Sequence, residues 1–502
     1  MKLMFPASAK NWLSLAGVII ALTALFMILF LVIVTIVMKE QAAYLGLVTY
    51  ILLPAVMIVG LLLIPLGMLR ETKRERREEG PAKRTGWPKI DLDEPGHRHA
   101  FFIFLVGTGI FVFLSAVGSY QAFHYTESTK FCGTLCHAVM EPEHTAHRNS
   151  PHAQVTCVAC HVGPGVDWYA RSKLSGLYQV YAVLADVYPR PIPTPIKNLR
   201  PARAVCEQCH WPQKFYGHKL QLRTHYLSDQ ANTPWRIGLN LKVGPPQEAL
   251  GLMEGIHWHI SPRVRIDYSA ADPGRQQIPW VRYTNLESGV AKVYRDKGKQ
   301  AVEPAAGEIR TMDCMDCHNR PSHLYRPPAQ FIDEAITAGR IPAALPEIKK
   351  LAVQLCAKQY SSAKIARQEI RAGIIEFYRQ DYPQLQASQL GLVEKGVAGV
   401  QAEFAKNIFP YMRVNWTAYP DNIGHLNFAG CFRCHNGSHT SDQGEAISRD
   451  CTMCHDIGIQ GIPGKGMERA LLGESLAFRH PVEIDDAWQQ TPCTDCHSGG
   501  NP

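Results

Sequence analysis

The pattern of hydrophobic and polar positions divides the chain into an apolar N-terminal part and a longer part of mixed character. Three apolar runs without a charged residue occupy positions 12–38, 44–69 and 100–120. Each run exceeds the about 20 residues that a membrane-spanning helix needs. We therefore predict that residues 1–122 form a three-helix transmembrane anchor.

The pattern beyond this anchor predicts shorter elements. Apolar residues recur at helical spacing over 172–187 and, in several stretches, over 329–406. The first of these segments is typical of an amphipathic helix that lies along a membrane interface. β-Branched and aromatic residues at 263–269 and 278–286 predict a small β-hairpin insertion. We expect a mainly α fold with much irregular structure.

Basic residues predict the orientation of the anchor. The segment 70–99 holds nine Lys and Arg residues, whereas the connection between the first two runs offers Lys39. Lys and Arg concentrate in cytoplasmic loops, so we expect the 70–99 loop in the cytoplasm and residues 123–502 on the outer side. The net charge of +8 follows mainly from this topology and gives no case for nucleic-acid binding.

A repeated cysteine motif carries the chemistry of the second part. The pattern C-x-x-C-H begins at Cys157, Cys206, Cys314, Cys431, Cys451 and Cys493. In this motif two thiols form thioethers with the vinyl groups of a haem, and the adjacent His lies under the iron. A chain with 15 Cys and 21 His in 502 residues does not repeat it six times by chance. Zinc sites would not require a His after every second Cys, and structural disulfides would not repeat so tight a spacing.

A seventh site precedes these six, with three residues between Cys132 and Cys136 and with His137 next. The residues predicted to attach seven c-type haems are Cys132, Cys136, Cys157, Cys160, Cys206, Cys209, Cys314, Cys317, Cys431, Cys434, Cys451, Cys454, Cys493 and Cys496. The remaining Cys356 lies in an amphipathic segment and is predicted to be a buried free thiol. We therefore expect a membrane-anchored multihaem cytochrome c. Its haems would be attached on the periplasmic side in bacteria, in agreement with the predicted orientation.

The histidines supply the axial ligands of the iron. The predicted proximal ligands are His137, His161, His210, His318, His435, His455 and His497. Low-spin haems also need a distal ligand. The distal candidates are His152, His225, His257, His259, His323, His425, His439 and His480. We favour His152, His225, His323, His425 and His439, with one of the other three as the sixth.

Three stretches, CHAVMEPE, SPHAQVTCVACHVGPG and SKLSGLYQVY, resemble the NapC/NirT family of membrane-anchored, quinol-oxidising multihaem cytochromes. The resemblance covers residues 120–215. It implies that the first haem lies nearest the membrane, is bound by a Met that corresponds to Met140, and leaves its other face open towards quinol. Met140 follows His137 by three residues where the family has two, so either residue is a candidate ligand, and we favour Met140.

The resemblance also implies a quinol pocket. Lys173 matches the pocket lysine of the family, and Gln179 stands near the position of a family carboxylate. Because Gln179 cannot take a proton, proton uptake would fall to Asp167, Asp186, water or the haem carboxylates. The residues expected at the quinol site are therefore Lys173, Gln179, Asp167 and Met140.

Together these features predict an inner-membrane protein that oxidises quinol, menaquinol in particular, and passes electrons to periplasmic cytochromes in anaerobic or extracellular respiration. A terminal reductase of the nitrite or hydroxylamine type is one alternative, and an electron relay without a quinol site is another. No C-x-x-C-K motif is present, which argues against the reductase. The oligomeric state stays open, with a homo-oligomer as one possibility.

The predicted domains follow the spacing of the motifs. They are the anchor (1–122), a module with the first three haems (123–215), a partly β insertion (216–313), the fourth haem with a helical region (314–430) and a cluster of the last three haems (431–502).

Overall fold

The computed structural model describes residues 10–38, 48–78, 92–135, 137–163, 165–196, 200–211, 217–244, 255–298, 303–471 and 473–501. Cys136 and parts of the predicted basic loop and β insertion lie outside these residues. The chain divides into two compact units, Met1–His137 and Ala138–Pro502.

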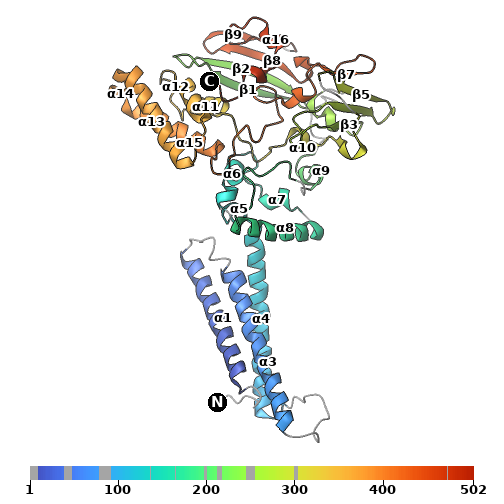
Figure 1. Ribbon diagram of the computed structural model, residues 1–502, viewed down its shortest axis with the longest axis vertical. Helices are drawn as coiled ribbons and strands as arrows, with labels where there is room; N and C mark the ends of the chain where they lie inside the picture. Colours follow the sequence, from blue (N-terminus) through green and yellow to red (C-terminus); the bar gives the residue numbers. More distant parts are fainter. Residues whose placement is uncertain are drawn as a thin grey trace. The chain divides into compact units, whose positions relative to one another are not determined.

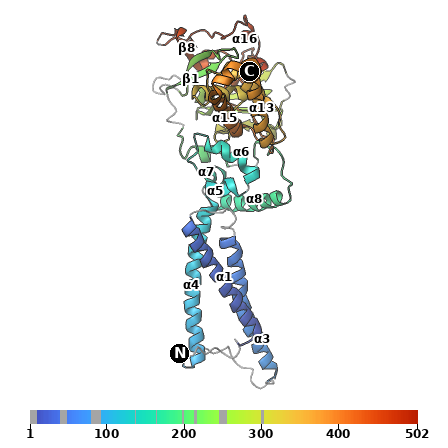
Figure 2. The ribbon, with the colours of Figure 1, turned by 90° about the vertical axis from the view of Figure 1, so that its left-hand side faces the viewer.

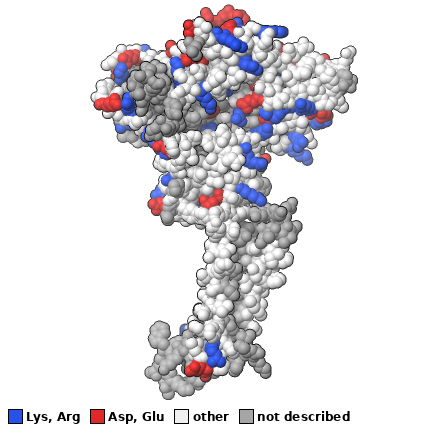
Figure 3. Space-filling view, turned by 180° about the vertical axis from the view of Figure 1, so that it is seen from behind, with Lys and Arg blue, Asp and Glu red and all other residues white. Residues whose placement is uncertain are grey.

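The N-terminal unit is helical. Its elements are α1 (Trp12–Met38), the short π-helix η2 (Val48–Leu52), α3 (Leu53–Glu78), α4 (Pro95–Thr126) and α5 (Thr129–Thr134). Three segments are long and apolar enough to cross a membrane, at Trp12–Val34, Leu53–Glu71 and Leu105–Thr126. Figure 3 shows few charged side chains on this unit between its ends. The three predicted apolar spans are thus present as helices.

Helices α1 and α3 pack closely through small residues. A Cβ on Gly17 would lie 2.6 Å from the carbonyl oxygen of Gly60, and a Cβ on Gly60 would lie 2.7 Å from the backbone nitrogen of Ala21. The Ser14 hydroxyl donates a hydrogen bond to the Ile64 carbonyl at 3.0 Å. Small residues let helices approach closely in lipid, where packing and hydrogen bonds drive their association.

The basic segment that was predicted as a loop is helical at both ends. Helix α3 continues through Arg70 to Glu78, because its Arg, Lys and Glu residues are good helix formers. Helix α4 begins at Pro95, whose fixed φ suits a first helical turn. The loop is therefore shorter than the predicted 70–99, and positions 79–91 lie outside the described residues.

Short helices open the larger unit. They are α6 (His137–Arg148), which starts at the unit boundary, α7 (Cys157–His161), α8 (Val166–Leu184) and α9 (Ala202–Cys206). Helix α8 accounts for most of the helix that was predicted over 172–187 and begins earlier in the chain.

Two antiparallel sheets follow (Figure 1). The four-stranded sheet has the order β1 (His218–Tyr226), β2 (Pro234–Lys242), β8 (His455–Ile462), β9 (Lys465–Arg469). The five-stranded sheet has the order β6 (Arg310–Thr311), β3 (Val264–Ser269), β4 (Trp280–Asn285), β5 (Ala291–Asp296), β7 (His439–Ser441). Strands β3 and β4 form the predicted hairpin, with Val264 paired to Asn285.

The sheets are more extensive than the small hairpin that was predicted, so the expectation of one small β insertion is wrong in extent. Strands β7, β8 and β9 come from the C-terminal region and join strands from the insertion, for example Leu241 with His455. Pairing between such distant segments depends on tertiary context and leaves little local signal in the sequence.

The helical region contains the largest apolar core. Its helices are α11 (Pro328–Thr337), α12 (Ile348–Ala357), α13 (Ala363–Asp381), α14 (Pro383–Ser388) and α15 (Leu390–Asn407). They lie together at one side of the larger unit (Figures 1 and 2). Fully buried side chains such as Ile348, Ile370 and Ile374 fill the space between them. Cys356 is 1% exposed and carries a free thiol, as predicted.

Candidate haem sites

Each C-x-x-C-H motif contains a short helical turn. The turns are α7, the end of α9, α10 (Cys314–Cys317), η8 (Gly430–Arg433), η9 (Cys451–Met453) and α17 (Cys493–Cys496). The backbone N–H of His210, His318 and His497 donates to the carbonyl of the first Cys of its motif at 2.8 Å, and that of His435 does so at 3.0 Å. One turn brings the two thiols and the imidazole of a motif close together, as the attachment of a single haem requires.

All six of these motif histidines face a second histidine from elsewhere in the chain. The ring centroids are 6.1 Å apart for His161 and His323, 5.9 Å for His210 and His152, 6.1 Å for His318 and His257, 5.7 Å for His435 and His259, 6.2 Å for His455 and His425, and 6.0 Å for His497 and His480. Two imidazoles on opposite sides of one iron stand about 6 Å apart between centroids, because each metal–nitrogen bond is about 2 Å long. The pairs therefore fit the axial ligands of six haems.

Hydrogen bonds orient five of the histidines that face a motif histidine. From Nδ1, His152 donates to the carbonyl of Pro321 (3.1 Å), His323 to Glu143 (3.1 Å), His257 to Val243 (2.6 Å), His259 to Ile256 (2.8 Å) and His480 to Val482 (2.7 Å). Metal-binding histidines usually donate their second ring N–H in this way, which leaves Nε2 for the metal. Burial lowers the pKa of His323 to about 4, so this ring is neutral and able to bind iron at pH 7.

Two favoured candidates have other hydrogen-bond partners, although His225 lies close enough to His497 to lower its pKa, after the larger effects of burial and of His480. His439 is fully buried, and its Nδ1 and Nε2 lie 2.9 Å from Asn436 Oδ1 and 2.7 Å from the Ile278 carbonyl oxygen. Its two ring nitrogens are therefore engaged by protein oxygens. His225 places Nδ1 3.3 Å from Asp333 Oδ2. Whether His225 or His439 serves as a distal ligand stays a prediction.

His257, His259 and His480 were predicted to provide one distal ligand among the three of them. In the structure, each of them faces a different motif histidine. His257 and His259 lie in the 3-10 turn η6 (Ile256–Ile260), and His480 follows β9. A 3-10 turn has three residues per turn, so side chains two positions apart point to different sides. The H-x-H spacing is the sequence signal that could have suggested two separate sites.

Consecutive motif turns are also neighbours in space. Helix α9 contacts both α7 and α10. Burial raises the pKa of the Cys160 thiol, and the nearby thiols of Cys157 and Cys209 raise it further. Burial also raises the pKa of the thiols of Cys434, Cys454 and Cys493. A nearby thiol of the preceding motif adds to this effect in each case, namely Cys317 for Cys434, Cys431 for Cys454 and Cys451 for Cys493. The six turns form a continuous series from the second predicted haem site to the seventh.

The first predicted site is described only in part. Cys132 lies on α5 and is partly buried, whereas Cys136 lies outside the described residues. Met140 is partly buried on α6, about one helical turn after position 137. The choice between His137 and Met140 as axial ligand stays a prediction.

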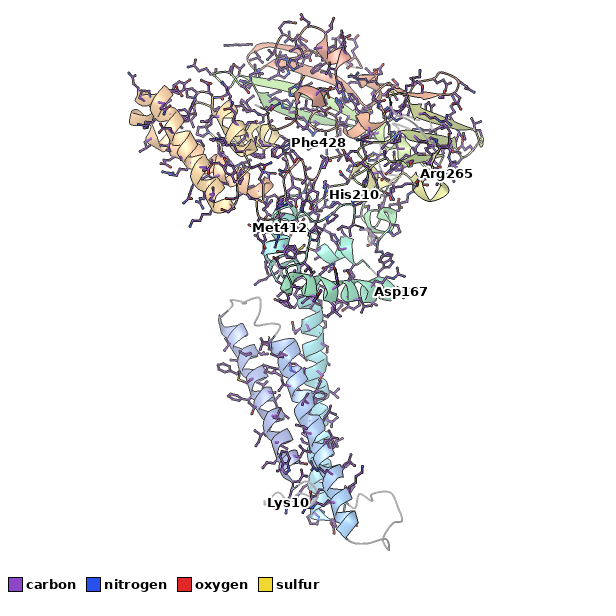
Figure 4. The ribbon with its side chains drawn as sticks, in the orientation of Figure 1. Lys10, Asp167, His210, Arg265, Met412 and Phe428 are labelled. Atoms are coloured by element: carbon purple, nitrogen blue, oxygen red, sulfur yellow. The ribbon has the colours of Figure 1, made fainter. Side chains whose placement is uncertain are left out.

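The other residues expected at the quinol site lie on α8. Asp167 stands in its first turn, at the end labelled in Figure 4. Lys173 places Nζ 4.8 Å from the centroid of the Tyr169 ring. Gln179 Nε2 donates to Ser175 Oγ at 3.5 Å. Because a helix turns by about 100° per residue, Lys173 and Gln179 point to different sides of α8.

One side of α8 presents large side chains to the surroundings. Leu174, Leu177, Tyr178, Tyr181 and Leu184 are 60–82% exposed. Their spacing places them on a single stripe of the helix, which we name the α8 stripe. Exposed apolar stripes on helices with polar opposite sides are typical of helices at a membrane interface.

Comparison with known proteins agrees with the motif and the helices. The N-terminal region of the NapC/NirT cytochrome c family matches residues 95–191, which include α4, the first two predicted haem motifs and α8. The cytochrome c-type protein ImcH of Geobacter sulfurreducens is 43% identical over 493 residues, which cover 97% of this chain and 95% of that protein. No solved structure matches the chain. With covalent c-type haem implied by these matches and three apolar helices before its haem motifs, the chain belongs to the NapC/NirT cytochrome c family.

Proposed function

We propose that the protein is an inner-membrane quinol dehydrogenase that oxidises quinol, menaquinol in particular, and delivers the electrons to periplasmic cytochromes. The observation that carries this proposal is the second histidine opposite each of the six C-x-x-C-H histidines. A haem with both axial positions occupied transfers electrons but offers no open position for a substrate. Substrate chemistry would therefore be left to the first site.

The chain would hold seven haems through its paired cysteines. The six histidine pairs would bind the second to seventh irons, and His137 or Met140 would bind the first. When bound, the haems supply one-electron redox chemistry with potentials set by ligands, hydrogen bonds and burial. The series of motif turns provides their order, from the membrane-proximal site towards Cys493 and Cys496, where we place the exit to a periplasmic partner.

Quinol binding would use α8. The α8 stripe is apolar, as contact with the bilayer that dissolves quinol requires. Lys173 borders this stripe by helical geometry, and its ammonium can donate a hydrogen bond to a quinol oxygen. Quinol oxidation releases two electrons and two protons. The Asp167 carboxylate on the same helix can accept a proton, whereas the amide of Gln179 cannot.

The orientation proposed for the anchor rests on its basic residues. The helical end of α3 carries Arg70, Lys73, Arg74, Arg76 and Arg77, which favour a cytoplasmic position. An outer, periplasmic location of residues 138–502 follows from three spans. Attachment of c-type haem in the periplasm supports the same orientation.

Two other functions make different predictions. A terminal reductase of nitrite or hydroxylamine would need an open iron in a catalytic site, and the six histidine pairs disfavour this at every site except the first. A relay without its own quinol site would contain the same pairs but would not react with quinol.

Anaerobic reduction of the detergent-solubilised, haem-loaded protein by a menaquinol analogue tests the proposal. The change in haem absorbance would be followed for wild type, for Lys173→Ala and for Lys364→Ala, an exposed lysine on α13 that serves as the control. We expect rapid reduction of wild type and the control, and at least tenfold slower reduction of Lys173→Ala. If dithionite reduces the protein but the menaquinol analogue does not, quinol oxidation is overturned and the relay is favoured. Quinol reduction at an equal rate in all three proteins would remove Lys173 from the pocket.

A further inference from the structure

One arginine beside the His161 and His323 pair lacks a partner for part of its charge. Arg320 donates from Nη2 to Thr194 Oγ1 at 2.8 Å, and its Cζ lies 4.2 Å from the centroid of the Tyr419 ring. Its Nε is buried and has no hydrogen-bond partner in the part of the chain that the structure describes. A neutral hydroxyl and an aromatic face do not neutralise a guanidinium.

No carboxylate forms an ion pair with Arg320 within the described ranges. Glu143 and Asp421 act on it electrostatically, but burial raises the pKa of both carboxyl groups. The guanidinium itself keeps its proton at any physiological pH. A charge that is withdrawn from water without an anion is strongly destabilising. Among the described residues, Arg320 therefore has two buried carboxyl groups nearby but no ion-pair partner, and its Nε is free to bind a further anion.

An unused buried Nε also occurs at Arg190, Arg236 and Arg326, but three arginines near the haem motifs are better balanced. Arg433 donates from Nε, Nη1 and Nη2 to three backbone carbonyls at 2.7–2.8 Å. Arg275 and Arg310 pair with the buried Asp316 carboxylate at 3.0 Å and 2.8 Å. Arg320 differs from these three residues because its buried Nε is unused.

The position of Arg320 identifies the missing anion. Arg320 precedes His323 by three residues in the segment that follows the fourth motif. The His323 ring in turn donates to the carbonyl of Glu143, one of the groups that act on Arg320. A haem bound between His161 and His323 would bring two carboxylates into this neighbourhood. A guanidinium matches a carboxylate through parallel N–H donors.

We propose that Arg320 binds a carboxylate of the haem held by His161 and His323 and raises the reduction potential of that haem. The inference rests on the proposed binding of haem at this pair. Reduction lowers the charge of the iron by one unit, so a fixed positive charge nearby stabilises the reduced form relative to the oxidised form. Arg320 is thus a positioning and tuning residue, supplied by the segment after the fourth motif to the haem of the second.

Redox titration of the haem-loaded, full-length protein tests this role, with reduction followed by absorbance under equilibrium conditions. Arg320→Gln removes the charge, Arg320→Lys keeps the charge but loses the planar fork, and Arg379→Gln on α13 is a control with an exposed arginine that pairs with Glu376. We expect one component of the titration to shift to a lower potential in the order wild type, Lys, Gln. The control should match wild type.

The shifted component can be assigned through its axial ligand. Met in place of a His ligand raises the potential of a haem, so His323→Met should move the same component upwards and Arg320→Gln should move it back down in the double variant. Equal titrations of wild type and Arg320→Gln would overturn the proposal. If Arg320→Gln does not accumulate, the test uses Arg320→Lys. A haem potential in Arg320→Lys equal to that of wild type would contradict binding of the haem carboxylate by the planar guanidinium. A haem content that shows no haem at Cys157 and Cys160 in wild type would instead reject the proposed haem binding.

Discussion

The ring centroids of His161 and His323 lie 6.1 Å apart, although one residue belongs to the second motif and the other follows the fourth. The same relationship holds for His318 of the fourth motif and His257 of the β-containing region. These pairs join segments that are far apart in the sequence. A haem bound between such segments would fix the fold of the larger unit as well as carry electrons.

Replacement of His323 by Ala should open the second haem without releasing it. The thioethers at Cys157 and Cys160 do not depend on the distal ligand, so the haem content should stay equal to wild type. Loss of one axial imidazole should convert one low-spin haem to the high-spin state. Electron paramagnetic resonance and the absorbance spectrum measure this change.

His439→Ala provides the matched control for a buried histidine. This substitution leaves Asn436 and the Ile278 carbonyl without their partner, so it should lower the free energy of unfolding by about 1–3 kcal/mol with no new high-spin haem. A new high-spin signal in His439→Ala, together with none in His323→Ala, would contradict the assigned pairs.

At the proposed seventh haem, His480 and His225 both act on the His497 ring, His480 more strongly. The His480 and His497 rings lie 6.0 Å apart, whereas His225 has Asp333 as its Nδ1 partner. His480→Ala should therefore produce one high-spin haem, and His225→Ala should leave every haem low spin. Both variants would be compared by electron paramagnetic resonance at equal haem content. The reverse result would restore the sequence-based preference for His225.

Helix α15 packs so closely that one glycine cannot take a side chain. A Cβ on Gly399 would lie 2.6 Å from the Arg340 carbonyl oxygen and 2.7 Å from Ile341 Cγ1. Backbone cannot move aside as a flexible side chain can, so Gly399→Ala should destabilise the helical region by about 1–3 kcal/mol. Thermal unfolding measures the effect.

Gly391 on the same helix is the control for Gly399. Nothing lies within 4 Å of the position where its Cβ would be. Gly391→Ala should stabilise the helix by about 0.5–1 kcal/mol, because alanine loses less conformational freedom on folding. Equal destabilisation by both substitutions would show that close packing at Gly399 is not the cause.

Local sequence patterns were sufficient for several features. The apolar runs predicted α1, α3 and α4 because a membrane-spanning helix must satisfy its own backbone and so leaves a long uniform signal. Helical periodicity predicted α8 and the region from α11 to α15, and it placed Cys356 in the buried side of α12. The spacing of each C-x-x-C-H motif predicts the attachment residues, because the residues that hold one haem lie within a single turn, and this assignment stays a prediction.

The sequence by itself therefore determined where the haem motifs and the long helices lie, since those signals are local. It did not determine the extent of the sheets. Strand β8 pairs with β2, although more than half of the sequence of the larger unit lies between them. Nor did it determine which histidine faces which motif. The H-x-H spacing of His257 and His259 does not say which motifs they face, and His480 looks no different from His225 or His439 in the sequence. Only the tertiary structure shows which of them face a motif histidine, because that relationship joins segments that are far apart in the sequence.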